Sequence, residues 1–444
     1  MRIAIVAEHI SPTAAVGGAH RDHSAPHIAE LSAALSRAGH TLTVYTRRVA
    51  HELPDRVATE HGYTLVQVPA GPATVLAEPL LVPSMSTFGS FLAQEWMRNR
   101  PDVAHADSWT TGIPTQLAAR DLGVPTVQSY ITLGVTEHGR GNSPDNDTSN
   151  RIRLERVLAK GAGRVVVTCS EQVSDLARMG LPRTRVSVVP LGVDLDRFTV
   201  SGSETAPRRG QRYRLVVAGE LMPEEGLDVA VAALPLMPDT ELVIAGGVAH
   251  DAAVDERTRL LDLAEKLGVH DRVHVAGYVS HDDMPALLRS ADVVVCTSGR
   301  EPSASVALEA MACGRPVVAS AVGTLRDTVV DGVTGLLVPP RSPRALATSV
   351  RELLADVVRH GSFGVAGRDR AVTRYSWDRV ATDTLAAYGR VVRRSHPLPS
   401  SRSHASTVAR GRVNTGEERA DAVARKPSDD LAVGTQDFDT GNSQ

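Results

Sequence analysis

The chain has 444 residues, a hydrophobic fraction of 42% and a formal net charge of −3. Its length exceeds what one hydrophobic core usually covers, so we expect two domains. The balanced charge gives no electrostatic reason to expect a nucleic-acid partner. The three cysteines, Cys169, Cys296 and Cys313, have no CxxC spacing, which argues against a disulfide framework or a structural zinc site and favours a reducing compartment.

The start of the chain has no apolar run long enough for a signal peptide. No stretch approaches the roughly 18 apolar residues that a membrane helix needs. We therefore expect a cytoplasmic protein without a transmembrane segment.

The first half of the chain alternates short apolar strands with amphipathic helices. In the segment 27–40, Ile28, Leu31 and Leu35 recur at helical spacing, and Gly39 supplies a C-terminal cap. The strands are almost continuously apolar, which is typical of parallel sheets covered on both faces. We predict strands within 2–8, 41–47, 102–106, 125–131, 164–169 and 186–192, and a further helix over 112–123.

A polar segment with glycine and proline, residues 199–212, interrupts this pattern and is typical of a linker. The alternation then restarts, so the sequence predicts an α/β protein with two Rossmann-like, doubly wound parallel-sheet domains. The second set of strands is expected within 213–220, 241–247, 272–279, 292–298, 316–322 and 334–340. We place the domains at 1–198 and 213–375, an amphipathic helix at 376–394 and a disordered tail at 395–444.

Two such domains leave a cleft at the carboxyl ends of their sheets, where ligands bind in doubly wound folds. The stretch 296–320, CTSGREPSASVALEAMACGRPVVAS, narrows the range of ligands. Glu301 follows a predicted strand, and Glu309 lies eight residues later within a predicted helix. The backbone amides of residues 303–305 lie at or before the start of that helix, where they are donors for an anion or for sugar hydroxyls.

The two carboxylates suit sugar recognition. Glu309 can accept two hydrogen bonds from a ribose diol, and Glu301 can do the same for a second sugar. The alternative is that Glu301 simply lies at the surface and that Glu309 complements the helix dipole. For either residue alone we prefer the alternative, but for the whole stretch we prefer the sugar site.

Residues 301–320 resemble the C-terminal signature of the family-4 retaining glycosyltransferases of GT-B fold, in the actinobacterial group that includes mycothiol-pathway and mannosyl transferases. The resemblance runs from Met1 to about Arg394. SPTAAVGG (11–18) is similar to the family's N-terminal Gly-Gly loop, and VVPLGVDLDRF (188–198) is similar to the end of its first domain. The helix that opens at YSWDRVA resembles the one that crosses back to the first domain in this fold.

The resemblance implies transfer of a hexose from a nucleoside-diphosphate sugar to a hydroxyl of a small-molecule or glycan acceptor. It implies retention of configuration, with no metal and no cofactor. Gly17 and Gly18 would let the backbone approach the diphosphate. Glu309 would bind the ribose, and Glu301 is the catalytic candidate that would orient the sugar.

Other parts of the donor and acceptor sites follow from the same resemblance. The amides of Ser303, Ala304 and Ser305 would help to orient the donor sugar. The backbone near Tyr278 and Val279 would meet the nucleobase. Acceptor specificity is expected in first-domain loops such as 69–95 and 134–150.

The chain departs from the family at its phosphate loop. In the family, an Arg and a Lys in a loop like G-R-L-x-x-x-K-G hold the diphosphate. Here the stretch AGELMPEEGLDV, aligned on Gly219 and Gly226, puts Glu220 in place of the Arg and Glu225 in place of the Lys. Like charges ~5 Å apart at an effective dielectric of ~20 repel by roughly 3 kcal/mol, so one swap changes donor binding by up to ~6 kcal/mol before screening. Micromolar binding amounts to only about 8 kcal/mol.

Five further positions depart from the family pattern. Ile131 replaces a His that lies beside the reacting sugar, and Glu137 replaces a Lys. Asp107 replaces a frequent His. At residues 303–304 a Ser-Ala pair replaces Phe-Gly, which puts a methyl group where the backbone meets the donor sugar.

Three hypotheses account for these replacements. The first is a rewired enzyme in which His20, Arg21 and Arg300 supply replacement cations, although each is more simply a surface residue. The second is a degenerate glycosyltransferase that keeps the fold and binds a partner or a neutral sugar. The third is a changed donor or acceptor, such as a cationic aminosugar, for which the acids would be ligands. A nucleotide-sugar epimerase shares the architecture but not the motifs.

Overall fold

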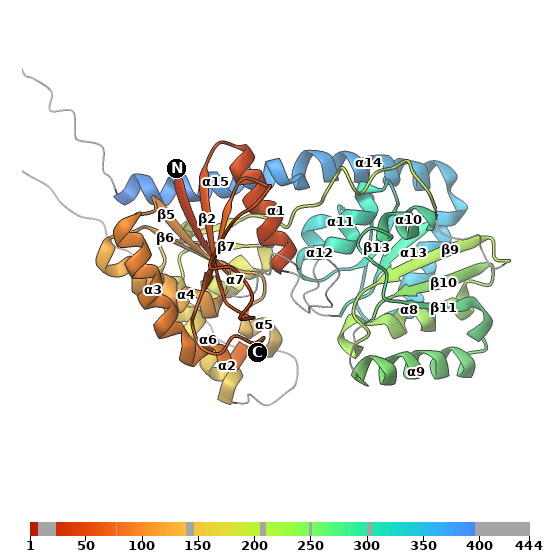
Figure 1. Ribbon diagram of the computed structural model, residues 1–444. Coiled ribbons are helices and arrows are strands. Elements are labelled where there is room, and N and C mark those ends of the chain that lie inside the picture. Colours follow the sequence, from red (N-terminus) through yellow and green to blue (C-terminus); the bar gives the residue numbers. More distant parts are fainter. Residues whose placement is uncertain are drawn as a thin grey trace, which may run out of the picture. The chain divides into compact units, whose positions relative to one another are not determined.

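The computed structural model describes residues 1–7, 24–76, 78–138, 146–204, 210–247, 251–299 and 304–395. The N-terminal part forms an eight-stranded sheet in the order β3-β4-β2-β1-β5-β6-β7-β8 (Figure 1). Its strands are β1 (Arg2–Val6), β2 (Thr41–Arg47), β3 (Arg56–Ala58), β4 (Thr64–Val68), β5 (Val103–Ala106), β6 (Thr126–Tyr130), β7 (Arg164–Val167) and β8 (Val186–Val188).

The register of this sheet is parallel at its centre. Ile3 of β1 pairs with Leu42 of β2 on one side and with Val103 of β5 on the other. The antiparallel pair is formed by the short β3 with β4. Every residue of β5 and β7 is buried, which agrees with the continuous apolar runs in the sequence and confirms the prediction of a parallel sheet covered on both faces.

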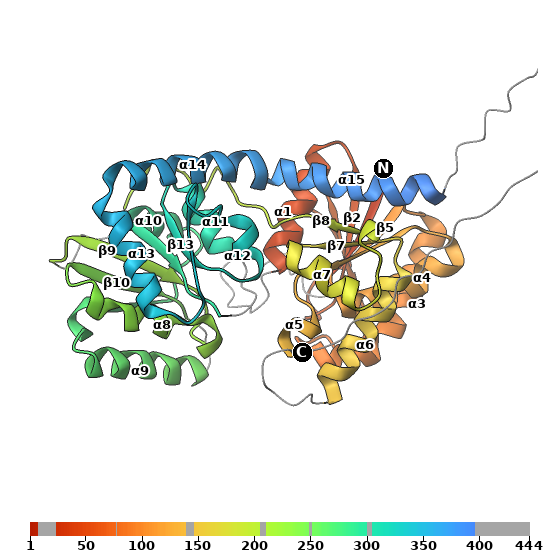
Figure 2. The same cartoon turned by 180° about the vertical axis from the view of Figure 1, so that it is seen from behind.

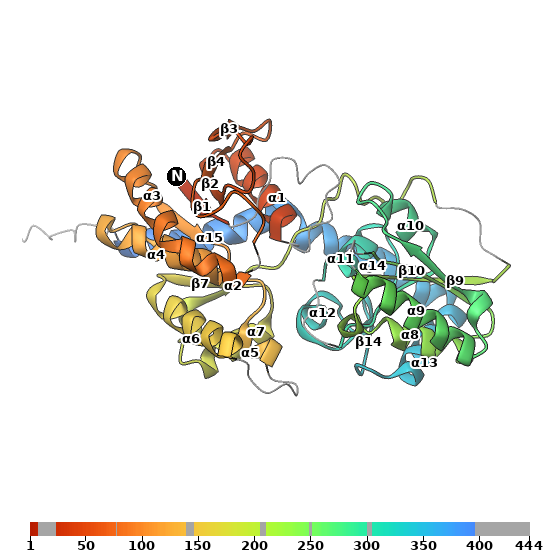
Figure 3. The ribbon, with the colours of Figure 1, turned by 60° about the horizontal axis from the view of Figure 1, so that its bottom comes forward.

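Helices cover both faces of the first sheet. One core joins alternate strand residues such as Ile3 and Ile5 to Ile28 and Leu35 of α1. The opposite face joins Val6 to α3 and α4, which lie side by side (Figure 3). The helices of this part are α1 (Ser24–Arg37), α2 (Glu78–Leu81), α3 (Met85–Arg98), α4 (Trp109–Leu122), α5 (Gly134–His138), α6 (Asn146–Gly161) and α7 (Ser170–Arg178), with short 3₁₀ turns at Val82–Ser84 and Arg183–Arg185.

The description of 69–95 and 134–150 as loops is wrong for much of their length. α2, the 3₁₀ turn at Val82–Ser84 and the start of α3 together occupy most of the first segment. α3 forms because Met85, Phe88, Leu92 and Trp96 make one buried stripe at helical spacing. α5 and the start of α6 occupy much of the second segment.

The second sheet has six parallel strands in the order β11-β10-β9-β12-β13-β14. One face packs on α8, α9 and α13, and the other on α10, α11, α12 and α14. Its strands are β9 (Tyr213–Ala218), β10 (Thr240–Ala245), β11 (Val273–Gly277), β12 (Val293–Cys296), β13 (Val317–Ser320) and β14 (Gly335–Val338).

The helices of this part follow the strands in the alternation that the sequence predicts. They are α8 (Leu227–Ala233), α9 (Asp251–Lys266), α10 (Met284–Ser290), α11 (Ser305–Ala312), α12 (Gly323–Thr328), α13 (Pro343–Ala355) and α14 (Val357–Tyr375), with 3₁₀ turns at Pro223–Glu225, Leu234–Leu236 and His270–Arg272. The structure therefore confirms an α/β fold with two doubly wound parallel sheets.

The helix α15 (Trp377–Ser395) follows α14 directly in the chain (Figure 2). Its residues Val380, Tyr388 and Val391 are buried in the same core as Ile3 and Ile28 of the first sheet. The end of the chain thus completes the hydrophobic core that its beginning starts. The predicted tail, 395–444, lies outside the described residues apart from Ser395.

Both sheets have a topological switch point. In the first sheet the strand order reverses between β1 and β5, and in the second between β9 and β12. Ligands of doubly wound folds bind outside the carboxyl ends of the strands at such a point. A site is therefore expected at the loops after β1 and β5, and at the loops after β9 and β12.

Candidate functional site

Glycines form the carboxyl edge of the second sheet. Gly219 follows β9, Gly246 follows β10 and Gly277 ends β11. A Cβ atom on Gly246 would lie only 2.2 Å from the carbonyl oxygen of Gly219, so a side chain does not fit there. This edge is made of closely packed backbone, as a site that receives a ligand against the main chain requires.

The loop 219–226, which carries Glu220, Glu224 and Glu225 and is called the acidic loop below, packs directly against the loop after β12. Thr297 donates its hydroxyl to the carbonyl oxygen of Glu225 at 3.4 Å, and the Gly299 amide donates to the carbonyl oxygen of Glu224 at 3.4 Å. Gly226 has a left-handed φ of +65°, and a Cβ there would lie 2.4 Å from the carbonyl oxygen of Thr297. The two sequence motifs thus meet at the β9/β12 switch point.

The carboxylates at this edge carry perturbed pKa values. Burial raises the pKa of Glu225, and the negative charges of Glu220 and Glu224 raise it further. Burial also raises the pKa of Glu309 to about 7, an effect that the positive charge of Arg197 partly offsets. The charges of Glu225 and Glu309 both add to the desolvation that raises the pKa of the Cys296 thiol, so both carboxylates act on the half-buried Cys296 at the end of β12.

The helix α11 begins at Ser305, with Ala304 as its N-cap residue. Glu309 is therefore one turn into the helix, on a side chain that keeps some exposed surface. Val279 is half-buried and packs against the core beside α11, whereas Tyr278 is 62% exposed.

Several predicted site residues lie outside the described residues. They are Gly17, Gly18, His20, Arg21, Arg300, Glu301 and Ser303. The backbone of Glu137 belongs to α5, but its side chain is likewise outside the description.

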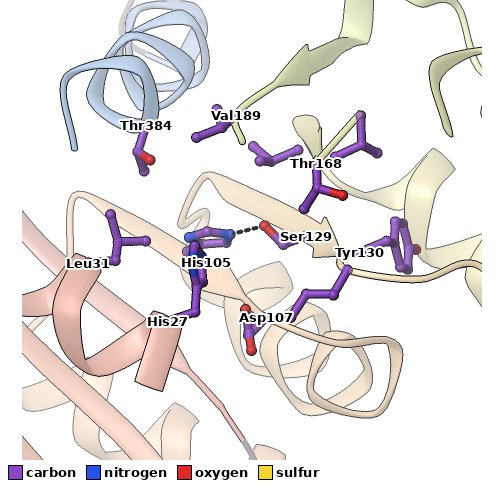
Figure 4. A pocket seen from close by; sticks show the side chains of 12 residues that line it. His27, Leu31, His105, Asp107, Ser129, Tyr130, Thr168, Val189 and Thr384 are labelled. Atoms are coloured by element: carbon purple, nitrogen blue, oxygen red, sulfur yellow. Dashed lines mark hydrogen bonds between the residues drawn. The ribbon is translucent and has the colours of Figure 1, made fainter. Parts of the chain in front are cut away.

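At the switch point of the first sheet, Asp107 directly follows β5 and is only 5% exposed. It lines a small pocket of about 20 Å³ together with Ile131, His27 of α1 and Thr384 of α15 (Figure 4). That volume accommodates one water molecule. The structure therefore brings the substituted positions Asp107 and Ile131 together.

The polar centre of this pocket was not anticipated from the sequence. His105 Nδ1 lies 2.7 Å from the Tyr388 hydroxyl, and its Nε2 lies 2.6 Å from Ser129 Oγ. Burial lowers the pKa of His105 to about 3 and that of His27 to about 4, so both rings are neutral at neutral pH. The one sequence signal was a histidine inside an otherwise apolar strand.

Within the described ranges, no group of three or more His, Cys, Asp or Glu side chains is arranged to hold a metal ion. Among the same residues, no helix combines the length and the apolar character needed to cross a bilayer.

Two family models match consecutive parts of the chain. Residues 24–197 match the model of Glycosyltransferase Family 4, and residues 203–370 match that of Glycosyl transferases group 1. Among curated proteins, a D-inositol 3-phosphate glycosyltransferase from Salinispora tropica is 33% identical, with 88% of this chain and 86% of the relative covered. The protein of that name from Xylanimonas cellulosilytica is 34% identical, with 88% and 97% covered.

Solved structures give the same result for the fold. Sucrose-phosphate synthase from Thermosynechococcus elongatus superposes with a TM-score of 0.77 at 26% identity, over 88% of this chain and 98% of that one. Anabaena HepE, solved in complex with UDP and glucose, has a TM-score of 0.66 at 18% identity, over 87% and 99%. The chain therefore belongs to the family 4 glycosyltransferases, the GT-B proteins of nucleotide-sugar transfer that the motifs 188–198 and 301–320 resemble.

Proposed function

We propose that this glycosyltransferase moves a hexose from a nucleoside-diphosphate sugar to a hydroxyl of a small-molecule or glycan acceptor, with retention and without a metal or cofactor. The curated relatives are named for an inositol phosphate acceptor, and HepE has been solved with UDP-glucose. The donor and acceptor of this chain belong to the same broad classes. We also propose a cytoplasmic location, because its three cysteines all lie in the described part and none forms a disulfide.

The observation that carries this proposal is the meeting of the two loops at the β9/β12 switch point. The hydrogen bond from the Gly299 amide to Glu224 fixes the acidic loop beside the segment that leads to α11. Glu309, one turn into that helix, is the residue that we propose binds the ribose hydroxyls. The backbone edge at Gly219 is our proposed site for the diphosphate, and the backbone at Val279 is our proposed contact for the base.

The remaining roles follow from the family pattern. Glu301 and the amides of residues 303–305 would orient the transferred sugar, with Gly17 and Gly18 facing the diphosphate from the first domain. Ser305 is the first residue of α11, and the backbone amides of a first helical turn point out of the helix toward its N-terminal side. Such amides suit the hydroxyls and phosphate oxygens of a nucleotide sugar.

A second candidate function is a degenerate homologue that binds a partner or a neutral sugar and transfers nothing. The pKa of Glu225, raised by burial and by Glu220 and Glu224, favours this candidate, because it marks a site with a surplus of negative charge. An ordinary donor site of this family has two cations at these positions. Loss of both would remove most of the affinity for a diphosphate.

Calorimetric titration with UDP, GDP and ADP separates the two candidates. If the protein is a transferase, at least one nucleotide binds, and Glu309→Ala lowers its affinity by about tenfold or more, as for loss of a hydrogen bond to a charged group. Glu352→Ala is the control, because Glu352 is an exposed glutamate of α13. A cooperatively folded protein that binds none of the three nucleotides would establish the degenerate homologue instead.

A further inference from the structure

The backbone of Arg341 has a conformation that is rare for its residue type. Its φ is +54°, and among the described residues it is the one non-glycine position with positive φ. The left-handed region suits glycine, and a side chain there is strained. Strain of this kind persists where the surrounding structure enforces it, and it concentrates at functional sites.

The position of Arg341 in the fold places its side chain at the carboxyl edge of the second sheet, where we propose that the donor binds. The residue lies in the loop between β14 and α13, at the carboxyl end of the second sheet. A Cβ on Gly299 would be 3.2 Å from Arg341 Nε and 3.9 Å from its Nη2. The guanidinium therefore covers the backbone of Gly299, the residue whose amide is bonded to Glu224 of the acidic loop.

Arg341 is also an exposed cation that is available for a ligand. Its side chain makes no hydrogen bond or ion pair with any residue in the described ranges. Arg197, whose charge reaches Glu309, is by contrast held by Asp194 at 3.6 Å and by Asp282 at 3.3 Å. An unengaged guanidinium presents five donors in a geometry that matches phosphate oxygens.

We propose that Arg341 supplies positive charge to the donor diphosphate, in place of the cations that the loop 219–226 lacks. The inference rests on the proposed function, because it assumes that a nucleotide binds at the β9/β12 edge. It explains how this edge can bind a diphosphate although Glu220 and Glu225 replace the family's Arg and Lys. The charge comes from the loop after β14, whose Arg341 packs on Gly299, the residue that is bonded to the acidic loop.

The variant Arg341→Gly separates the charge from the fold. Glycine adopts the observed φ without strain, so the unfolding temperature of this variant should not fall below that of the wild type. Its affinity for UDP and for inorganic pyrophosphate should nevertheless fall by about tenfold or more, as for loss of a charged hydrogen bond. Its affinity for uridine, which has no phosphate, should stay unchanged. Arg344→Ala, at an exposed arginine in the first turn of α13, is the matched control and should bind all three probes like the wild type.

The outcomes distinguish this inference from the proposed function. A wild-type protein that binds neither UDP nor pyrophosphate contradicts the proposed function and the inference together. A wild-type protein that binds UDP, with Arg341→Gly binding it equally well, overturns the inference alone and places the compensating charge elsewhere. An equal loss for uridine and UDP would also overturn it, because the arginine would then act on the nucleoside.

Discussion

The hydroxyl of Tyr388 lies 2.7 Å from Nδ1 of His105, and this contact joins the last helix of the described chain to the central strand β5 of the first sheet. The tyrosine is fully buried and the histidine is 2% exposed. The rings meet edge to face, with their centroids 5.5 Å apart. The contact thus combines apolar packing with a hydrogen bond between two buried side chains.

Tyr388→Phe removes the hydroxyl and leaves His105 Nδ1 without this partner. We expect a loss of about 1–3 kcal/mol in the free energy of unfolding, because an unsatisfied buried polar group is expensive. Urea-induced unfolding of both proteins measures this loss of free energy. Tyr213→Phe is the control, since Tyr213 is half-buried at the start of β9 under the guanidinium of Arg212. Equal stability of Tyr388→Phe and the wild type would show that the hydrogen bond contributes nothing.

The two neutral histidines of the pocket make the fold sensitive to acid. Their folded-state pKa values, about 4 for His27 and about 3 for His105, lie below the usual 6.5. Between pH 6.5 and about 4 the unfolded chain therefore binds protons that the folded chain does not. The free energy of unfolding should fall as the pH falls through this window.

His27→Phe tests that dependence and keeps a ring beside Trp377, whose centroid is 5.4 Å from that of His27. We expect a shallower decline of stability between pH 6.5 and 4, followed by denaturant unfolding at each pH. His51→Phe, at an exposed position, should retain the wild-type slope. An unchanged slope in His27→Phe would mean that His27 takes up its proton over the same pH range in the folded and the unfolded state.

Gly226→Ala should disrupt the contact between the acidic loop and the loop after β12. The substitution meets a left-handed φ of +65° and a carbonyl oxygen 2.4 Å away. The backbone conformation alone costs about 1–2 kcal/mol, and displacement of Thr297 adds to it.

Gly268→Ala separates these contributions, because Gly268 has a similar φ of +68° and a Cβ there would have nothing within 4 Å. Denaturant unfolding should show a larger loss for Gly226→Ala than for Gly268→Ala. Equal losses would show that the loop relaxes away from Thr297 freely.

Reversal of the charges of the acidic loop tests whether its side chains face the diphosphate. The double substitution of Glu220→Arg and Glu225→Lys restores the family's charges, and we expect the affinity for UDP to rise by at least about tenfold. Glu352→Lys, a distant charge change on α13, is the control. Titration of both proteins at two salt concentrations measures the effect, which salt should weaken. An unchanged UDP affinity would mean that these side chains do not face the diphosphate.

Much of the fold was predictable because its signals are local. The strands, such as Arg2–Val6 and Val293–Cys296, are short runs of mostly apolar residues that the structure buries. α3 was missed although Met85, Phe88, Leu92 and Trp96 recur at helical spacing, because the intervening Ser, Thr and Gly are typical of loops.

The site was only partly predictable because its contacts are not local. The motif around Glu309 and the charge reversal at Glu225 could both be found from the sequence. The cover of Gly299 by Arg341 joins loops that follow different strands, and a positive φ is normally expected at glycine. His105 is polar by type, and its neutral state depends on a helix that lies 283 positions further along the chain.

The burial of Val380, Tyr388 and Val391 beneath the first sheet has a consequence for synthesis. A ribosome completes all eight strands of that sheet by Val188 and all six of the second by Val338. Until residues 377–395 emerge, the apolar side chains of α1 and the first sheet that pack against α15 have no cover. The nascent chain then exposes surface that chaperones recognise. The half of the protein that is made first is therefore the half that matures last.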